Sequence, residues 1–138
     1  ILQYKTHAKE KSLYNTPNTF GVYLMGEVFK WIKAGGGLDA MARRNAEKAR
    51  LLYDIIDSTD FWRGTADAGS RSFMNVCFRA STAELENRFC DEATAAGLDG
   101  LKGHRATGGM RASIYNACSL AAVEALAQFM KEFERRNG

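Results

Sequence analysis

The sequence has 138 residues, of which 46% are hydrophobic and 25% are charged. A chain of this length and hydrophobic content buries about 68% of the surface that it exposes when unfolded, so we expect a single compact globular domain. The 19 basic and 16 acidic residues leave a net charge of +3 and are interspersed. This balance predicts mild attraction for anionic ligands and argues against a dedicated nucleic-acid surface.

Cysteine and histidine usage argues against a disulfide framework and a metal site. Cys77, Cys90 and Cys118 form no CxxC pair, and their odd number fits reduced thiols in a cytosolic protein. The two histidines, His7 and His104, have no thiolates at the spacing of a zinc site. Apolar runs are interrupted by charge well before about 18 residues, so no membrane span is expected. We therefore expect a cytoplasmic protein without a bound metal.

The amino-terminal third begins with residues 1–14, which show no clean period and predict an irregular or short helical lead-in. The sequence Asn-Thr-Pro at 15–17 predicts the start of a helix, because Asn and Thr are preferred caps and Pro is favoured at the first helical position. That helix should run to about Ala34, where glycines 35–37 end it. Apolar residues surround most of it, so it should be buried on more than one side.

A second helix is predicted from about Leu38 to Ile56, with one apolar stripe and a charged face. The stripe consists of Leu38, Met41, Asn45, Ala49, Leu52 and Ile56. The charged residues Arg43, Arg44, Lys48 and Arg50 lie mostly off the stripe, so we expect them to be solvated.

The remainder of the chain predicts a small sheet covered by helices. Strands are expected within residues 61–79, and a helix should begin at Thr82 and stop at Gly97. A short strand at 98–101 should follow, and a last helix should begin after Ser119. The fold class predicted is an α/β two-layer sandwich, with a small, mainly antiparallel sheet and helices packed on it.

The segment KGHRATGGMR, residues 102–111, gathers basic and imidazole donors around three glycines, and we name it the anion loop. Arginine binds a carboxylate or phosphate through two parallel hydrogen bonds, and glycine allows close approach of an anion to the backbone. Alternation after the double glycine predicts a half-buried strand on which Arg111 faces away from the apolar side. His104 and Arg105 precede the glycines and would serve a second anionic group, which suggests a dianionic substrate. The pattern alone fits a solvated basic hairpin connection equally well.

Four segments closely resemble the phosphoserine aminotransferases. They are NTPNTF at residues 15–20, RSFMNV at 71–76, KGHRATGGMRASIYN at 102–116 and FERRNG at 133–138. Together with the chain between them, they resemble the carboxy-terminal portion of that family over nearly the whole sequence. The family consists of pyridoxal-phosphate enzymes of the aspartate-aminotransferase type, which convert glutamate and 3-phosphohydroxypyruvate into 2-oxoglutarate and phosphoserine in serine biosynthesis. Some bacterial relatives also contribute to pyridoxine synthesis.

The resemblance implies roles for five residues of this sequence. Arg111 would hold the substrate α-carboxylate, and His104 with Arg105 would bind the distal phosphate or carboxylate. Asn15 and Thr16 would contact the cofactor phosphate in the neighbouring subunit's active site, which implies a homodimer with composite sites. Asn18 replaces the second proline that is usual in the family, and this replacement should loosen the turn.

The resemblance also implies what this chain lacks. We expect one carboxy-terminal small domain over residues 1–138, with a connecting segment and helix at 1–36, and no cofactor-binding large domain. The Schiff-base lysine would lie upstream of Ile1, so the chain would contain no catalytic residue and would be inactive alone. Two alternatives remain: a non-catalytic anion-binding module of the same fold, and an aminotransferase for another dicarboxylic or phosphorylated substrate.

Overall fold

The structure, a computed structural model, describes all 138 residues. The chain forms two compact units, Ile1–Leu38 and Asp39–Gly138. The first unit contains helices α1 (Tyr4–Lys9) and α2 (Thr19–Ala34). The short helix α1 agrees with the helical lead-in expected for residues 1–14.

Helix α2 begins later than the sequence predicted. The start expected at residues 15–17 was wrong, because Pro17 lies outside the helix and Asn18 is its N-cap. The Asn18 Oδ1 accepts a hydrogen bond from the Gly21 N–H at 3.0 Å. The Thr19 N–H donates to the Pro17 carbonyl at 2.8 Å, so a tight turn centred on Asn18 delays the helix. Asparagine at this position therefore stabilises the helix start, where the sequence had suggested a looser turn.

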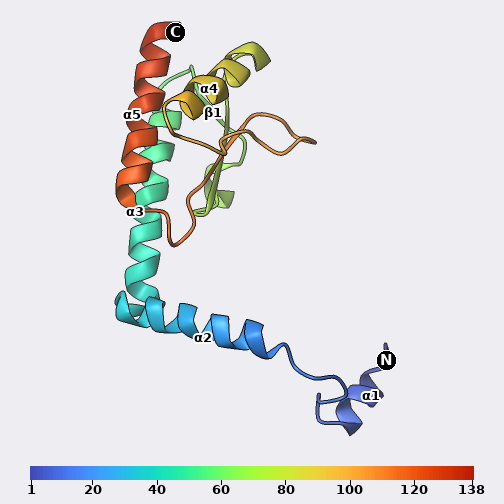
Figure 1. The fold of residues 1–138 in the computed structure, drawn as a ribbon. Coiled ribbons are helices and arrows are strands. Elements are labelled where there is room, and N and C mark those ends of the chain that lie inside the picture. Colours follow the sequence, from blue (N-terminus) through green and yellow to red (C-terminus); the bar gives the residue numbers. More distant parts are fainter. The chain divides into compact units, whose positions relative to one another are not determined.

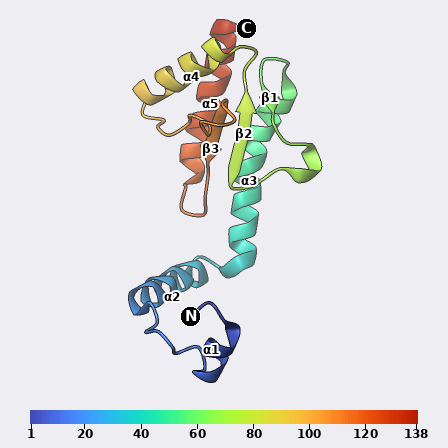
Figure 2. The ribbon, with the colours of Figure 1, turned by 90° about the vertical axis from the view of Figure 1, so that its right-hand side faces the viewer.

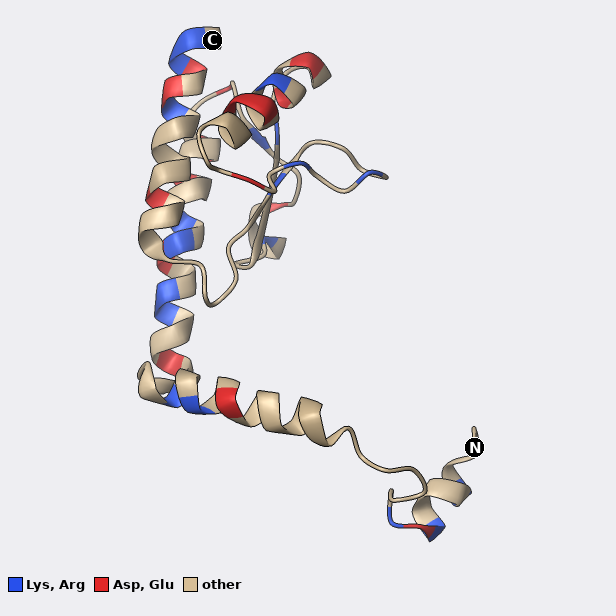
Figure 3. Ribbon diagram, in the orientation of Figure 1, with Lys and Arg blue, Asp and Glu red and all other residues tan.

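Helix α2 has no residue buried within this chain. Phe20 is 71% exposed and Phe29 is 60% exposed, although both are large and apolar. Figure 3 shows that the first two turns of α2 carry no charged residue. A helix with this surface is stable in water only when other surfaces cover it.

The second unit combines a sheet with three helices. Its helices are α3 (Gly37–Ser58, which begins two residues before the unit), α4 (Ala83–Ala95) and α5 (Leu120–Asn137). Its strands are β1 (Arg63–Gly64), β2 (Asn75–Arg79) and β3 (Met110–Ser113), with the short 3-10 helix η1 (Ala68–Ser70) between β1 and β2. The sheet has the order β1-β2-β3, and both pairs are antiparallel.

Helices and sheet form two layers, as the sequence predicted. Helices α3 and α5 run side by side behind the sheet, and α4 lies near the end of β2 (Figures 1 and 2). Trp62, Phe78, Phe89 and Phe133 are at most 2% exposed and form the centre of the core. The Trp62 ring lies 5.2 Å from Phe89 and 5.6 Å from Phe78 in edge-on contacts, so the aromatic cluster joins the strands to α4 and α5.

Local signals placed the last two helices correctly. Thr82 caps α4 by accepting from the Leu85 N–H at 3.3 Å, and Ser119 caps α5 by accepting from the Ala122 N–H at 3.2 Å. The strand expected at residues 98–101 is absent. There the Asp99 Oδ1 accepts from the Gly100 N–H at 2.7 Å, and this turn leaves only a bridge between Lys102 and Met110.

Lys48 corrects the prediction that the charged face of α3 is solvated throughout. Lys48 is only 2% exposed, and its Nζ donates to the carbonyl oxygens of three residues that follow β3. The acceptors belong to Ile114 at 3.0 Å, Tyr115 at 2.8 Å and Cys118 at 3.0 Å. Three donors meet three acceptors, which is the full capacity of an ammonium group.

Burial lowers the pKa of Lys48, since removal from water disfavours the charged form. The three carbonyl dipoles offset this cost by accepting from the charged form. Nearby, the Asn45 Nδ2 donates to the Asn116 Oδ1 at 2.7 Å. The hydrogen bonds of Lys48 and of Asn45 together attach the segment after β3 to α3.

Replacing Lys48 by Met tests this attachment. Lys48→Met leaves three carbonyl groups without their donor, so we expect a loss of about 3 kcal/mol in the free energy of unfolding, measured by urea denaturation followed by circular dichroism. Lys131 is exposed on α5, so Lys131→Met should change that free energy by less than about 0.5 kcal/mol. Equal effects of the two substitutions would show that the Lys48 contacts contribute nothing.

Candidate functional site

The anion loop is a closed turn stabilised by its own backbone. The Gly103 N–H donates to the Gly109 carbonyl at 2.9 Å, and the Arg111 N–H donates to the Leu101 carbonyl at 2.8 Å. These bonds pair Leu101 and Gly103 with the start of β3 and the residue before it. The loop therefore has a defined path, although the bridge between Lys102 and Met110 is its only ladder contact.

His104 is the centre of the turn. Its carbonyl accepts from the Thr107 N–H at 2.9 Å and the Gly108 N–H at 2.8 Å. Its ring Nδ1 accepts from the Ala106 N–H at 3.2 Å. An accepting Nδ1 has no proton in the neutral ring, so the proton is on Nε2 and makes that atom a hydrogen-bond donor.

A cavity of about 380 Å³ lies between the anion loop and α4. Its basic lining includes Lys102, His104 and Arg105. The lining also contains Arg79 from the end of β2 and Glu86 from α4, whose side chains form an ion pair at 2.6 Å. Because that pair is neutral as a unit, the remaining loop donors give the cavity its positive character. Figure 3 shows basic residues and no acidic residue along the loop.

Cys90 also lines this cavity, and its chemistry does not suit a nucleophile. Burial raises the pKa of the Cys90 thiol, because the thiolate loses its hydration. A reactive cysteine needs the opposite shift. The cavity therefore fits ligand binding better than covalent chemistry.

Arg111 lies on β3 outside the lining of that cavity. As predicted, it faces away from the apolar side, since Met110 and Ala112 are each 1% exposed and contribute to the core. The Arg111 Nε is buried and has no hydrogen-bond partner, and the side chain makes no ion pair within the chain. An arginine of this kind has the capacity to bind a carboxylate.

Polar side chains accompany Arg111 on the same face of the sheet. The Ser113 Oγ donates to the Asn75 Oδ1 at 3.2 Å, and the Asn75 Nδ2 donates to the Tyr115 Oη at 3.0 Å. Asn75 pairs with Ser113 across β2 and β3, and Cys77 pairs with Arg111. The face that carries Arg111 is thus polar and preordered.

Asn15 and Thr16 lie in the first unit, before α2. Both are exposed, and neither side chain makes a hydrogen bond within the chain. The capping role suggested for Thr16 and its neighbours was wrong, because Asn18 performs it. The amide and hydroxyl of these two residues are therefore free to contact a ligand.

Sequence reasoning missed Arg79 and Glu86. Arg79 ends a strand and Glu86 lies in the first turns of α4, so each has an ordinary local explanation. Their relation to the anion loop depends on the pairing of β2 with β3, which places Phe78 opposite Met110. One local signal was available: Glu86 lies three residues before the apolar Phe89 and therefore on the same face of the helix. In the structure this is the inward face of α4, and Glu86 is only 7% exposed.

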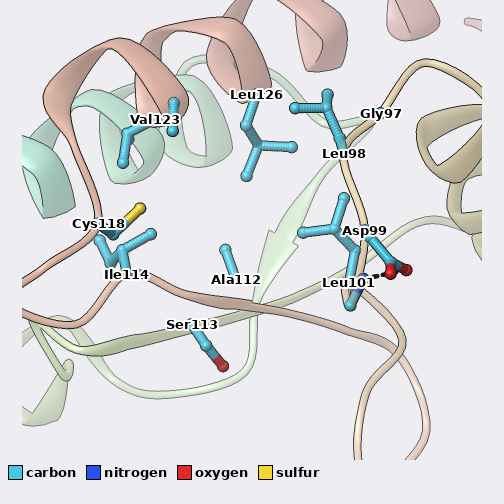
Figure 4. Close-up of a pocket in the computed structure, with 12 residues that line it drawn as sticks. Gly97, Leu98, Asp99, Leu101, Ala112, Ser113, Ile114, Cys118, Val123 and Leu126 are labelled. Carbon is cyan, nitrogen blue, oxygen red and sulfur yellow. Dashed lines mark hydrogen bonds between the residues drawn. The ribbon is translucent and has the colours of Figure 1, made fainter.

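A second cavity, of about 340 Å³, is mainly apolar. It lies between β3, the start of α5 and residues 97–101 (Figure 4). Side chains of Leu98, Ile114, Val123 and Leu126 project into it, and the Asp99 carboxylate is occupied by its bond to the Gly100 N–H (Figure 4). No basic residue lines this cavity, so it does not suit an anion.

No group of three or more His, Cys, Asp or Glu side chains is arranged to hold a metal ion. No helix is sufficiently long and apolar to cross a membrane.

Comparison with known proteins gives one consistent family. The family described as aminotransferase class-V matches residues 1–126. A phosphoserine aminotransferase of Desulfosudis oleivorans is 56% identical over 100% of this chain, and one of Herpetosiphon aurantiacus is 55% identical over the same share. The chain spans 38% and 39% of the length of these two relatives.

Solved structures agree with the sequences. The phosphoserine aminotransferase of Bacillus circulans subsp. alkalophilus superimposes with a TM-score of 0.90 at 51% identity, covering 99% of this chain and 38% of that one. A phosphoserine aminotransferase from Trichomonas vaginalis, whose structure is described as PLP bound, gives 0.82 at 40% identity, covering 93% of this chain and 37% of that one.

The path of the anion loop can be tested at Gly109. This residue has a φ of +70°, and a Cβ there would lie 2.4 Å from the Arg79 Cδ and 3.0 Å from the Phe78 carbonyl oxygen. We expect Gly109→Ala to lower the free energy of unfolding by about 1–3 kcal/mol in urea denaturation. Gly69→Ala, where a Cβ meets nothing within 4 Å, is the matched control and should have little effect. An unchanged free energy of unfolding in Gly109→Ala would contradict the loop geometry.

Proposed function

The chain belongs to the class-V aminotransferase family, and from that premise we propose that it is the substrate-recognising carboxy-terminal part of a phosphoserine aminotransferase. The longer protein transfers an amino group between glutamate and 3-phosphohydroxypyruvate, a step of serine biosynthesis. The names of relatives that are 51–56% identical support this assignment. In some organisms the same activity would also serve pyridoxine biosynthesis.

The observation that carries the proposal is the pair of separated cationic sites. Arg111 on β3 binds the α-carboxylate that both substrates share. His104 and Arg105 in the anion loop bind the distal group, which is a phosphate in one substrate and a carboxylate in the other. Neither Arg105 nor Arg111 makes an ion pair within the chain, which supports their availability for these acids. Two anchors fix the substrate's orientation, and positioning of this kind contributes about 7–11 kcal/mol at best.

The residues of this chain fit one part of the cofactor. Asn15 and Thr16 are exposed and uncommitted, and their amide and hydroxyl groups suit a phosphate oxygen. We propose that they contact the phosphate of pyridoxal phosphate in the neighbouring subunit's site. When bound, pyridoxal phosphate carries the amino group between the two substrates.

We propose that none of the lysines of this chain binds the cofactor covalently. Lys48 is the one buried lysine, and its three N–H groups are already donated to carbonyl oxygens. A lysine held in this way has no lone pair for covalent chemistry. We therefore propose that the reactive lysine and the large domain lie outside the 138 residues, which by themselves do not catalyse transfer.

The assembly we propose is a cytoplasmic homodimer with composite active sites. Exposed apolar side chains around α2 support the presence of a covering surface from the large domain or the other subunit. The small domain with its connecting segment over residues 1–36 would then contribute to both sites of the dimer. The unpaired cysteines support a reducing compartment.

Two other assignments make different predictions. A non-catalytic anion-binding module would bind phosphate or dicarboxylates but would have no aminotransferase activity in its natural, longer form. An aminotransferase for another acidic substrate would transfer amino groups to unphosphorylated acceptors at least as well. Substrate comparison in the longer natural protein separates all three.

Arg111→Lys in that longer protein tests the proposed function. Lysine keeps the charge and loses the bidentate geometry, so we expect kcat/KM for both substrates to fall by about a hundredfold. Arg63→Lys, on an exposed position of β1, is the matched control and should retain full activity. Unchanged kcat/KM in Arg111→Lys, or equal activity of the unsubstituted enzyme on phosphorylated and unphosphorylated acceptors, would contradict the assignment.

A further inference from the structure

We propose that Arg79 and Glu86 are positioning residues that hold the anion loop in the shape that receives the distal acid of the substrate. The inference rests on the proposed function and extends it to two residues that the resemblance did not indicate. Neither residue is expected to touch the substrate. Their effect passes through the backbone at the tip of the loop.

Arg79 connects three elements through its guanidinium group. Its Nε donates to the Glu86 Oε1 at 2.6 Å, and its Nη1 donates to the Thr107 carbonyl at 3.0 Å. Glu86 is only 7% exposed, so the pair is partly withdrawn from water and has a defined geometry. The Glu86 carboxylate thus holds the Arg79 side chain in place, and Arg79 in turn holds the backbone at Thr107.

The Arg79 side chain also supports the double glycine of the loop. A Cβ added at Gly109 would lie 2.4 Å from the Arg79 Cδ, and one at Gly108 would lie 3.7 Å from its Nη1. The backbone of the loop therefore lies directly against the side chain. At Gly109 this contact leaves no room for a side chain.

Holding Thr107 also holds His104. The Thr107 N–H donates to the His104 carbonyl, and the next amide, of Gly108, donates to the same oxygen. Within the same turn, the Ala106 N–H donates to the His104 Nδ1 at 3.2 Å. The turn therefore selects the tautomer in which Nε2 carries the proton, so His104 offers a donor to an anion.

The charge of Arg79 is already matched by Glu86, which argues against a direct role in anion binding. Lys102, His104 and Arg105 remain as the donors of the cavity. The chemical class that these donors suit is a distal phosphate or carboxylate. Arg79 then affects how these three donors are oriented toward the anion and is not itself one of them.

The first experiment uses the longer natural enzyme with Arg79→Met. We expect KM for 3-phosphohydroxypyruvate and for glutamate to rise by about tenfold to a hundredfold, because small misplacements of binding groups have effects of that size. Activity on alanine, an amino donor without a distal acid, should be unchanged. The ratio of kcat/KM for glutamate to that for alanine should therefore fall by the same factor.

Three further variants separate positioning from general stability. Arg79→Lys keeps an ion pair with Glu86 but lacks the second nitrogen for Thr107, and Glu86→Gln removes the charge that fixes Arg79. Both should lower the same ratio, by less than Arg79→Met does. Arg88→Met is the matched control, since Arg88 donates to the Glu92 Oε1 at 2.7 Å on the exposed part of α4 and has no contact with the loop. It should leave the ratio unchanged.

The second experiment observes His104 directly by nitrogen-15 nuclear magnetic resonance of the 138-residue chain. Only His7 and His104 contribute imidazole signals. In the unsubstituted chain, His104 should show an unprotonated Nδ1, and its signals should shift with inorganic phosphate. In Arg79→Met and Arg79→Lys, we expect a mixture of tautomers and a phosphate affinity at least fivefold weaker.

The outcomes distinguish this inference from the proposed function. If the unsubstituted enzyme transfers no amino group, the proposed function fails, and the nuclear magnetic resonance measurement still decides whether Arg79 orders His104. If transfer occurs but Arg79→Met and Arg79→Lys lower kcat/KM equally for glutamate and alanine, the positioning role is overturned. An unchanged His104 tautomer and phosphate affinity in both variants overturn it as well.

Discussion

The buried ammonium group of Lys48 is the contact on which the arrangement of the site depends. It attaches the chain that leaves β3 to the middle of α3 through three carbonyl groups, and the bond between Asn45 and Asn116 reinforces the attachment. The direction of β3 is consequently fixed from one end by a helix of the core. Arg111 therefore extends from a strand that is held to a helix of the core just beyond its carboxy-terminal end.

The distribution of ion pairs distinguishes structural from available cations. Arg71 pairs with Asp57, Arg79 with Glu86, and both Arg88 and Arg136 with Glu92. The pairs of Arg71, Arg79 and Arg136 connect separate segments of the second unit, whereas the pair of Arg88 lies within α4. Arg105 and Arg111 make no such pair, so their charges are available at the two places where we propose that the acidic groups bind.

Sequence reasoning succeeded where the deciding contact is local. Thr82 and Ser119 cap their helices through residues three positions away, and such pairs are visible in the sequence. It failed at Lys48, whose acceptors lie 66 to 70 residues away, and periodicity treats a lysine as solvated. The pairing of Arg79 with Thr107 likewise requires the strand register. His104, Arg105 and Arg111 were identified through resemblance, and their roles stay predictions.

In the anion loop, the residues that set the path of the backbone differ from the residue whose side chain is free to bind a ligand. At Gly103 and Gly109 an added Cβ would lie 2.2 Å from the Gly108 carbonyl oxygen and 2.4 Å from the Arg79 Cδ, so both positions are closed to substitution. Arg105, by contrast, is exposed and makes no hydrogen bond within the chain. A new distal group could therefore be accommodated by exchanging a side chain while the backbone stays as it is. Selectivity in such a loop can diverge through single substitutions, without a change in its length or fold.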